Sequence, residues 1–132
     1  MRRKDIMNFL TTTIARILFS IPFIALGIGH LRNADMMAGV VPVPGGIMWI
    51  YITGIALILA GFSAITKIMG KQAMMMLAVL LFVFIISIHL PAAMKPETMM
   101  MGMMGLYKDT GLMGGALLLA GIFDREKKNE HV

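Results

Sequence analysis

Long apolar stretches, separated by short polar segments, fill most of the chain. Residues 47–65 and 74–90 contain no aspartate, glutamate, lysine or arginine. Each stretch approaches the ~20 apolar residues that carry an α-helix across the ~30 Å hydrocarbon core of a bilayer. Two further stretches are apolar except for Arg16 in the first and Lys108 with Asp109 at the start of the second. The pattern predicts four membrane-spanning helices, at about residues 6–29, 47–66, 73–90 and 106–123.

The fourth predicted helix has the shortest apolar stretch. Counted from Thr110 to Phe123 it has 14 residues, too few to cross a bilayer unless Lys108 and Asp109 lie within the helix or in its first turn. The third helix is expected to end at Pro91, because proline interrupts helices. Loops are expected at 30–46, which contains Pro42, Pro44 and a glycine pair, and in the methionine-rich connection 91–105.

Basic residues lie mainly at the ends of the predicted helices. With four helices, eight lysines and arginines lie on the side of both termini, and Arg32, Lys95 and Lys108 lie on the other. Because cytoplasmic loops carry the excess of Lys and Arg, both termini are predicted to be cytoplasmic. The net charge of +5 is therefore interpreted as a topology signal, and no nucleic-acid partner is expected. The predicted fold is all-α, an integral membrane four-helix bundle forming a single domain over residues 1–132.

Composition agrees with a membrane protein and limits its chemistry. Hydrophobic residues make up 58% of the chain and charged residues 14%, against about 25% charged residues in a typical soluble domain. There is no cysteine, so the chain itself cannot supply dithiol chemistry, disulfides or thiolate metal ligands. A redox role therefore requires a cofactor or a partner.

One face of the first predicted helix is polar at two depths. Arg16, Ser20, Phe23, Gly27 and His30 follow steps of four, three, four and three residues, which places them on the same side of an α-helix. An arginine near the middle of a bilayer costs at least about 2.5 kcal/mol, so Arg16 is expected to face a partner or water inside the bundle. A structural arginine that bonds to helix carbonyls or to a neighbouring helix is the alternative interpretation.

Four polar residues are expected to meet at the outer face of the bundle. His30 ends the first helix, His89 ends the third, and Lys108 with Asp109 begins the fourth. Asp109 could accept a hydrogen bond from a histidine, and Lys108 could extend to lipid headgroups. In the alternative interpretation, Asp109 only stabilises the positive end of the fourth helix dipole. Together with Arg16 and Ser20, these residues are the candidate ligand-binding set.

Histidines on different helices allow two kinds of cofactor. Imidazole can bind haem iron or donate a hydrogen bond to a quinone carbonyl. His30 and His89 could share one iron only if the first and third helices face each other. Haem is therefore a weaker candidate than a quinone.

Methionine and glycine patterns suggest further interpretations. Thioethers suit Cu(I), and the chain has 16 methionines, but methionine also fills gaps as a flexible apolar residue. Small residues allow close helix packing, either within the bundle or between protomers. The candidate copper ligands are Met99, Met100, Met101, Met103 and Met104, and the candidate packing glycines are Gly27, Gly54, Gly61, Gly111 and Gly115.

Several segments, in order, resemble the DoxX family of small four-helix membrane proteins. They are RILFSIPFIALGIGHL at 16–31, the Pro-Gly loop before the second helix, HLP at 89–91, and LYKDTGLMGGALLLAG at 106–121. The resemblance implies a multi-pass protein of the bacterial cytoplasmic membrane. It points to Arg16, His30, His89, Lys108 and Asp109 as candidate positions. The absence of cysteine and the high methionine content depart from the family.

The resemblance implies an architecture more firmly than an activity. Family members include subunits of a thiosulfate:quinone oxidoreductase, proteins tied to oxidative-stress complexes or to quinone and catechol resistance, and distant receptor-assembly chaperones. The leading hypothesis is a redox-associated inner-membrane protein that binds a quinone or similar small hydrophobic ligand in an outer-face pocket. Whether it is itself a subunit of a quinone-linked oxidoreductase stays open.

In the leading hypothesis Arg16 forms the floor of the pocket, His30 and His89 donate to the ligand or exchange protons with it, and Asp109 orients one histidine. Two alternatives belong to other classes of protein. The first is a non-enzymatic scaffold or assembly factor that binds a partner protein or a second copy of itself. The second is a Cu(I)-binding membrane protein. In all three cases the lipid bilayer is an expected partner.

Overall fold

Every regular element of the computed structural model is a helix. The structure describes residues 1–39 and 44–132, and no strand occurs in these ranges. The predicted all-α class is therefore confirmed. The helices form two compact units, Met1–Gly70 and Lys71–Val132, which are described separately.

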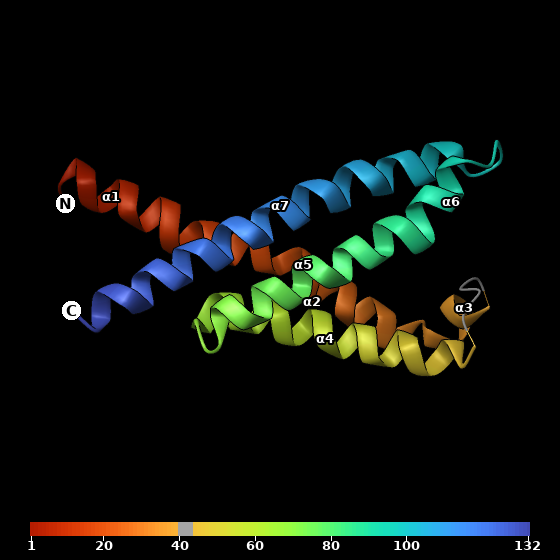
Figure 1. Cartoon of the computed structure of the whole chain (residues 1–132), viewed down its shortest axis with the longest axis horizontal. Helices are drawn as coiled ribbons and strands as arrows, with labels where there is room; N and C mark the ends of the chain where they lie inside the picture. The colour runs from red at the N-terminus through yellow and green to blue at the C-terminus, as the bar shows by residue number, and fades with distance from the viewer. Residues whose placement is uncertain (40–43) are drawn as a thin grey trace. The chain divides into compact units, whose positions relative to one another are not determined.

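The first unit begins with one long helix built from three consecutive segments: α1 (Arg3–Asn8), the π-helical η1 (Phe9–Ile14) and α2 (Ala15–Arg32) (Figure 1). The hydroxyl of Thr11 at the wide turn donates to the carbonyl oxygen of Met7 at 2.7 Å, a local bond that often accompanies helix bending. Instead of ending near residue 29, the helix continues to Arg32. The side-chain amide of Asn33 then donates to the carbonyl oxygen of Gly29 at 2.9 Å.

The connection to the second long helix contains a short helix. The predicted loop 30–46 includes α3 (Ala34–Ala38), and Pro42 lies outside the described residues. Helix α4 (Gly46–Thr66) starts after Gly45, whose φ of 74° favours glycine, and ends at Lys67, whose φ is 65°. These bounds agree closely with the predicted second helix.

Glycines bring α2 and α4 close together. A side chain at Gly27 would overlap the carbonyl oxygen of Gly54, and a side chain at Gly61 would overlap the side chain of Ile24. Ser20, Phe23 and Gly27 are the buried residues of α2, which is the face that helical spacing predicts. Small residues at these positions allow the two backbones to approach, as in membrane helix pairs.

The outward faces of the first unit are apolar. Leu18 is 62% exposed on α2, and Leu59 and Phe62 are 61% and 52% exposed on α4. A water-soluble helix pair would carry polar residues at such positions. Lipid is the environment that suits them.

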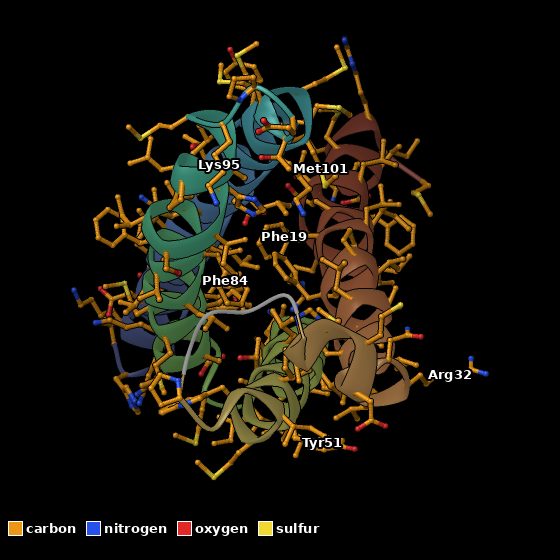
Figure 2. The ribbon with its side chains drawn as sticks, turned by 90° about the vertical axis from the view of Figure 1, so that its right-hand side faces the viewer. Phe19, Arg32, Tyr51, Phe84, Lys95 and Met101 are labelled. Atoms are coloured by element: carbon orange, nitrogen blue, oxygen red, sulfur yellow. The ribbon has the colours of Figure 1, made fainter. Side chains whose placement is uncertain are left out.

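Polar and aromatic side chains mark one end of the first unit. Figure 2 shows Arg32, in the last turn of α2, and Tyr51, near the start of α4, extending outward. Trp49 lies in the same turn as Tyr51, and its Nε1–H donates to the carbonyl oxygen of Pro44 at 3.2 Å. Aromatic residues and basic side chains are enriched where helices leave the hydrocarbon core. Their positions are those expected of a membrane interface.

The second unit is a helical hairpin. One arm is α5 (Gly70–Phe84), the π-helical η2 (Ile85–His89) and α6 (Leu90–Ala93), and the other arm is α7 (Met99–Glu130) (Figure 1). Lys71, near the start of the first arm, contacts Asp124 near the end of the second. At the closed end, Gly102 lies against the backbone of Ala92 and Ala93. The two arms are therefore antiparallel.

Two predicted boundaries in this unit are wrong. The first arm does not stop at Pro91 but continues to Ala93, with the wide turn of η2 directly before α6. The methionine-rich segment 99–105 is not a loop but the first turns of α7. Methionine is a strong helix former, and the hydroxyl of Thr98 anchors the turn by donating to the carbonyl oxygen of Ala92 at 2.8 Å.

Three helices in the described residues are long and apolar enough to cross a membrane: Arg3–Arg32, Gly46–Thr66 and Gly70–Ala93. This confirms the prediction of a helical membrane protein. Although α7 has 32 residues, it is not among the three, since Lys108, Asp109 and many glycines lower its hydropathy. The fourth crossing and the cytoplasmic termini stay predictions.

Asp124 forms an ion-pair cluster that predicts an acid-sensitive contact. Lys71 Nζ and Lys128 Nζ lie 2.8 Å and 2.9 Å from its two carboxylate oxygens. Hydrogen bonds from Lys71 and from Lys128 lower the pKa of Asp124 from 3.8 to about 2. A lowered carboxyl pKa stabilises the fold above about pH 4, and this contribution disappears as the pH falls towards 2.

We therefore expect Asp124→Asn to cause a small decrease in the thermal unfolding midpoint at pH 5 and a clearly smaller one at pH 2, where the carboxyl is partly protonated. The measurement is thermal unfolding in detergent between these pH values. Asp35→Asn, at an exposed aspartate in α3, is the matched control and should show no such pH dependence. Equal effects of the two substitutions at every pH would contradict the assignment.

Candidate functional site

A buried carboxylate and a histidine meet in the hairpin of the second unit. His89, at the end of η2, lies with its Nε2 2.8 Å from Oδ2 of Asp109 on α7. The side chain of Asp109 is 4% exposed and that of His89 is 20% exposed. A buried polar group needs a partner, and each of these residues provides one for the other.

Gly105 makes room for the imidazole ring of His89. It lies one helical turn before Asp109 on α7, and a Cβ atom at this position would overlap Nδ1, Cε1 and Cγ of the ring. The missing side chain lets the ring lie flat against α7 while Nε2 reaches the carboxylate. Gly105 is thus a positioning residue, and the pattern of the sequence does not predict this role. The only available signal was its spacing of four residues from Asp109.

The wide turn of η2 also helps to orient His89. The hydroxyl of Ser87 donates to the carbonyl oxygen of Val83 at 2.6 Å, within the turn that precedes Pro91. A π-helical turn inserts an extra residue and rotates the side chains that follow it relative to a regular helix. Such turns are frequent at functional sites, and here the turn carries one of the two residues of the buried pair.

Lys108 completes the charge arrangement around Asp109. Its Nζ lies 3.3 Å from Oδ1 of Asp109, and its side chain is 51% exposed. The carboxylate therefore has one partner on each oxygen, a part-buried imidazole and a half-exposed ammonium. The contact with His89 agrees with the predicted hydrogen bond between Asp109 and a histidine. Lys108 contacts Asp109, and about half of its side chain stays exposed.

The helix-dipole interpretation of Asp109 is wrong. Since α7 starts at Met99, Asp109 lies in the third turn rather than the first, where the effect of the dipole has faded. Its burial needs another explanation. The direct contacts with His89 and Lys108 provide it.

The pair leaves one nitrogen of His89 available. Since an ionised carboxylate only accepts hydrogen bonds, Nε2 carries a proton and donates it to Asp109. Within the described part of the chain, Nδ1 has no hydrogen-bond partner. In the neutral ring Nδ1 is an acceptor, and in the charged ring it is a donor. The arrangement can therefore accept a proton at Nδ1 while Asp109 stabilises the imidazolium.

Arg16 and Ser20 belong to the first unit, on α2. Nε of Arg16 donates to the carbonyl oxygen of Thr12 at 3.0 Å, and the hydroxyl of Ser20 donates to the carbonyl oxygen of Arg16 at 2.7 Å. The bond to Thr12 supports the structural interpretation of Arg16. However, Nη1 of Arg16 is buried without a hydrogen-bond partner among the described residues. A buried donor of this kind calls for an acceptor oxygen.

His30 is engaged within its own helix. Its Nδ1–H donates to the carbonyl oxygen of Leu26 at 2.7 Å, which leaves Nε2 as the acceptor nitrogen. The structure thus brings together three predicted residues, His89, Lys108 and Asp109. Arg16, Ser20 and His30 each donate to a carbonyl oxygen of their own long helix.

Two kinds of candidate metal ligand are considered, groups of His, Cys, Asp and Glu side chains and the methionines of α7. The described residues contain no group of three or more His, Cys, Asp and Glu side chains that could hold a metal ion. The methionines proposed for Cu(I) lie in the first two turns of α7, where Met100, Met101 and Met104 are 78%, 73% and 66% exposed. Haem and copper stay predictions.

The glycines of α7 separate into two groups. Gly102 and Gly105 contact the other arm of the hairpin, whereas a side chain at Gly111, Gly114 or Gly121 would meet no atom within 4 Å. Among the described residues of the second unit, Gly111 therefore makes no close packing contact. Its packing against other helices of the bundle or between protomers stays a prediction.

Comparison of the chain with protein-family models, with curated proteins and with solved structures found no match in any of the three. The resemblance to the DoxX family rests on the quoted segments alone and stays a prediction. Functional inference therefore depends on the chemistry of the site.

Proposed function

We propose that this chain is a redox-associated membrane protein that binds a quinone, or a similar small hydrophobic ligand with a carbonyl or hydroxyl oxygen. The observation that carries the proposal is the pair formed by the buried Asp109 and the part-buried His89. Intramembrane ionisable residues are functional candidates by default, because isolated charges are costly in lipid. The DoxX resemblance supports the same ligand class and a location in the bacterial cytoplasmic membrane.

The chemistry assigned to the pair concerns binding and proton exchange. Asp109 holds Nε2–H and thereby fixes the tautomer and orientation of His89, as a carboxylate does for a general-base histidine. Nδ1 then accepts a proton from a ligand hydroxyl, or donates to a ligand carbonyl when the ring is charged. A quinone supplies the redox chemistry, and its reduced form supplies the hydroxyl. Lys108 contributes positive charge beside Asp109.

Arg16 has a separate place in the proposal. Its unpartnered Nη1 can donate to a ligand oxygen, and the guanidinium is always charged. This is a candidate contact of the first unit, considered apart from the His89–Asp109 pair of the second unit. His30 is a weaker candidate, because Leu26 already accepts its Nδ1–H.

The test is binding of a short-chain quinone to protein reconstituted in phosphatidylcholine nanodiscs, measured for the wild type and for His89→Ala. We expect His89→Ala to weaken binding by at least about tenfold, the size of one hydrogen bond to a charged group. His131→Ala, which changes an exposed histidine in the C-terminal tail, is the matched control and should leave binding unchanged. Equal affinities of all three proteins would contradict the proposal.

A scaffold function has one observation in its favour. Exposed methionines gather on the first turns of α7, with Met100 and Met104 on one side of the helix at a spacing of four residues. Flexible apolar side chains suit a surface that contacts a partner protein. If gently extracted protein carries no quinone and only lipid or another polypeptide, the scaffold becomes the better proposal.

A further inference from the structure

The first turns of the protein contain a hollow lined by cations and an apolar side chain. It is a shallow, open depression on the helix surface, lined by the exposed side chains of Arg3, Lys4, Met7 and Asn8. Arg3 and Met7 are four residues apart and lie side by side on the helix surface, and Lys4 and Asn8 form a second pair of the same spacing next to them. Charged and amide groups therefore face the same space as a thioether.

The acidic residue next to this hollow is already engaged. Asp5 accepts a hydrogen bond from the backbone N–H of Arg2 at 3.1 Å, and its Oδ2 lies 3.6 Å from Nε of Arg2. In the part of the chain that the structure describes, neither Arg3 nor Lys4 forms an ion pair. Two cations thus face the hollow without a counter-charge from the protein.

Helix length places the hollow at the level of the lipid headgroups. The helix Arg3–Arg32 has 30 residues, which corresponds to about 45 Å at 1.5 Å per residue, whereas the hydrocarbon core is about 30 Å thick. Its end turns must therefore extend beyond the core. Directly after the hollow, Phe9 and Leu10 are 51% and 48% exposed, as expected for side chains that contact acyl chains.

We propose that Arg3, Lys4 and Asn8 bind the phosphate of an anionic phospholipid headgroup, while Met7 and the apolar residues after it contact its acyl chain. The side chains make this site, and the backbone amides take no part in it. Guanidinium and ammonium groups both suit phosphate oxygens, and an acyl chain needs the apolar surface. A free phosphate ion would use the cations but not that surface.

The experiment compares two lipids in vesicles of phosphatidylcholine that contain a small fraction of spin-labelled phosphatidylglycerol or spin-labelled phosphatidylcholine. The relative association constant of the anionic lipid is measured for the wild type and for Arg3→Gln/Lys4→Gln. Each cation near an anionic lipid contributes about fivefold, so we expect a loss of about 25-fold. Arg125→Gln/Lys127→Gln removes the same charge from exposed positions of α7, so it removes only the general attraction of juxtamembrane cations and should cause a clearly smaller loss.

A second variant, Asn8→Leu, tests the site without removing a charge. The distribution of basic residues influences how a protein inserts into the membrane, and this variant leaves that distribution unchanged. Asn8→Leu should weaken the preference for phosphatidylglycerol by about fivefold, the effect of one neutral hydrogen bond. Equal losses from the two double variants, or no effect of Asn8→Leu, would overturn the proposal. Displacement of the labelled lipid by millimolar inorganic phosphate would also overturn it, because the site would then bind free phosphate.

Discussion

Replacing His89 and Asp109 together by leucine is expected to leave the free energy of unfolding within about 1 kcal/mol of the wild type, while Asp109→Leu alone lowers it by about 2 kcal/mol. In the single variant, Nε2–H of His89 stays at a largely buried position without its acceptor. In the double variant both polar groups are absent, and two apolar side chains take their place. Reversible unfolding in mixed micelles measures both changes.

Quinone binding is expected to respond in a different way from stability. Both variants lack the oriented imidazole, so both should lose at least about tenfold in affinity. A double variant that is stable but does not bind would separate the ligand role of the pair from its role in the fold. If the stable double variant binds the quinone as the wild type does, the pair is only structural and the proposed function is wrong.

The polar face of the first helix could be predicted because helical geometry fixes it. Residues separated by steps of three and four lie on one side of a helix in any packing arrangement, and Ser20, Phe23 and Gly27 are indeed the buried residues of α2. The bounds of α4 could be predicted for a similar reason. Its apolar stretch has glycines at one end and a basic turn at the other.

The start of α7 could not be predicted, because methionine suits both a helix and an apolar connection. The charged dipeptide at 108–109 predicts a helix start close to it, yet the helix begins at Met99. That error also misplaced Asp109 in the first turn. Its burial depends on a contact with the other arm of the hairpin, and such a contact follows from the antiparallel register rather than from local sequence.

Pro91 produced a second error of the same kind. A proline usually ends a helix because its ring clashes with the preceding turn. In this chain η2 widens that turn, and the helix continues to Ala93. The sequence contains no separate mark of the wide turn, so neither the continuation nor the orientation of His89 could be inferred.

Gly105→Ala is expected to destabilise the protein by about 2 kcal/mol, although alanine favours a helix over glycine by about 1 kcal/mol. The new Cβ would overlap the imidazole of His89. The ring could move away only by breaking its bond to Asp109, so the variant should also weaken quinone binding. Gly111→Ala is the matched control on the same helix. A side chain there meets no atom within 4 Å, and this variant should be neutral or more stable by up to about 1 kcal/mol.

Removal of the ring tests the cause of this destabilisation. In a His89→Ala background the overlap no longer exists, and Gly105→Ala should then behave like Gly111→Ala. The expected coupling energy between positions 89 and 105 is therefore about 2 to 3 kcal/mol, a size typical of residues in direct contact. If Gly105→Ala costs the same in both backgrounds, some other contact of α7 requires the glycine, and Gly105 does not position the imidazole. If the coupling is found, Gly105 positions the imidazole of His89 although it has no side chain of its own. The one histidine–carboxylate pair in the described residues then depends on this glycine.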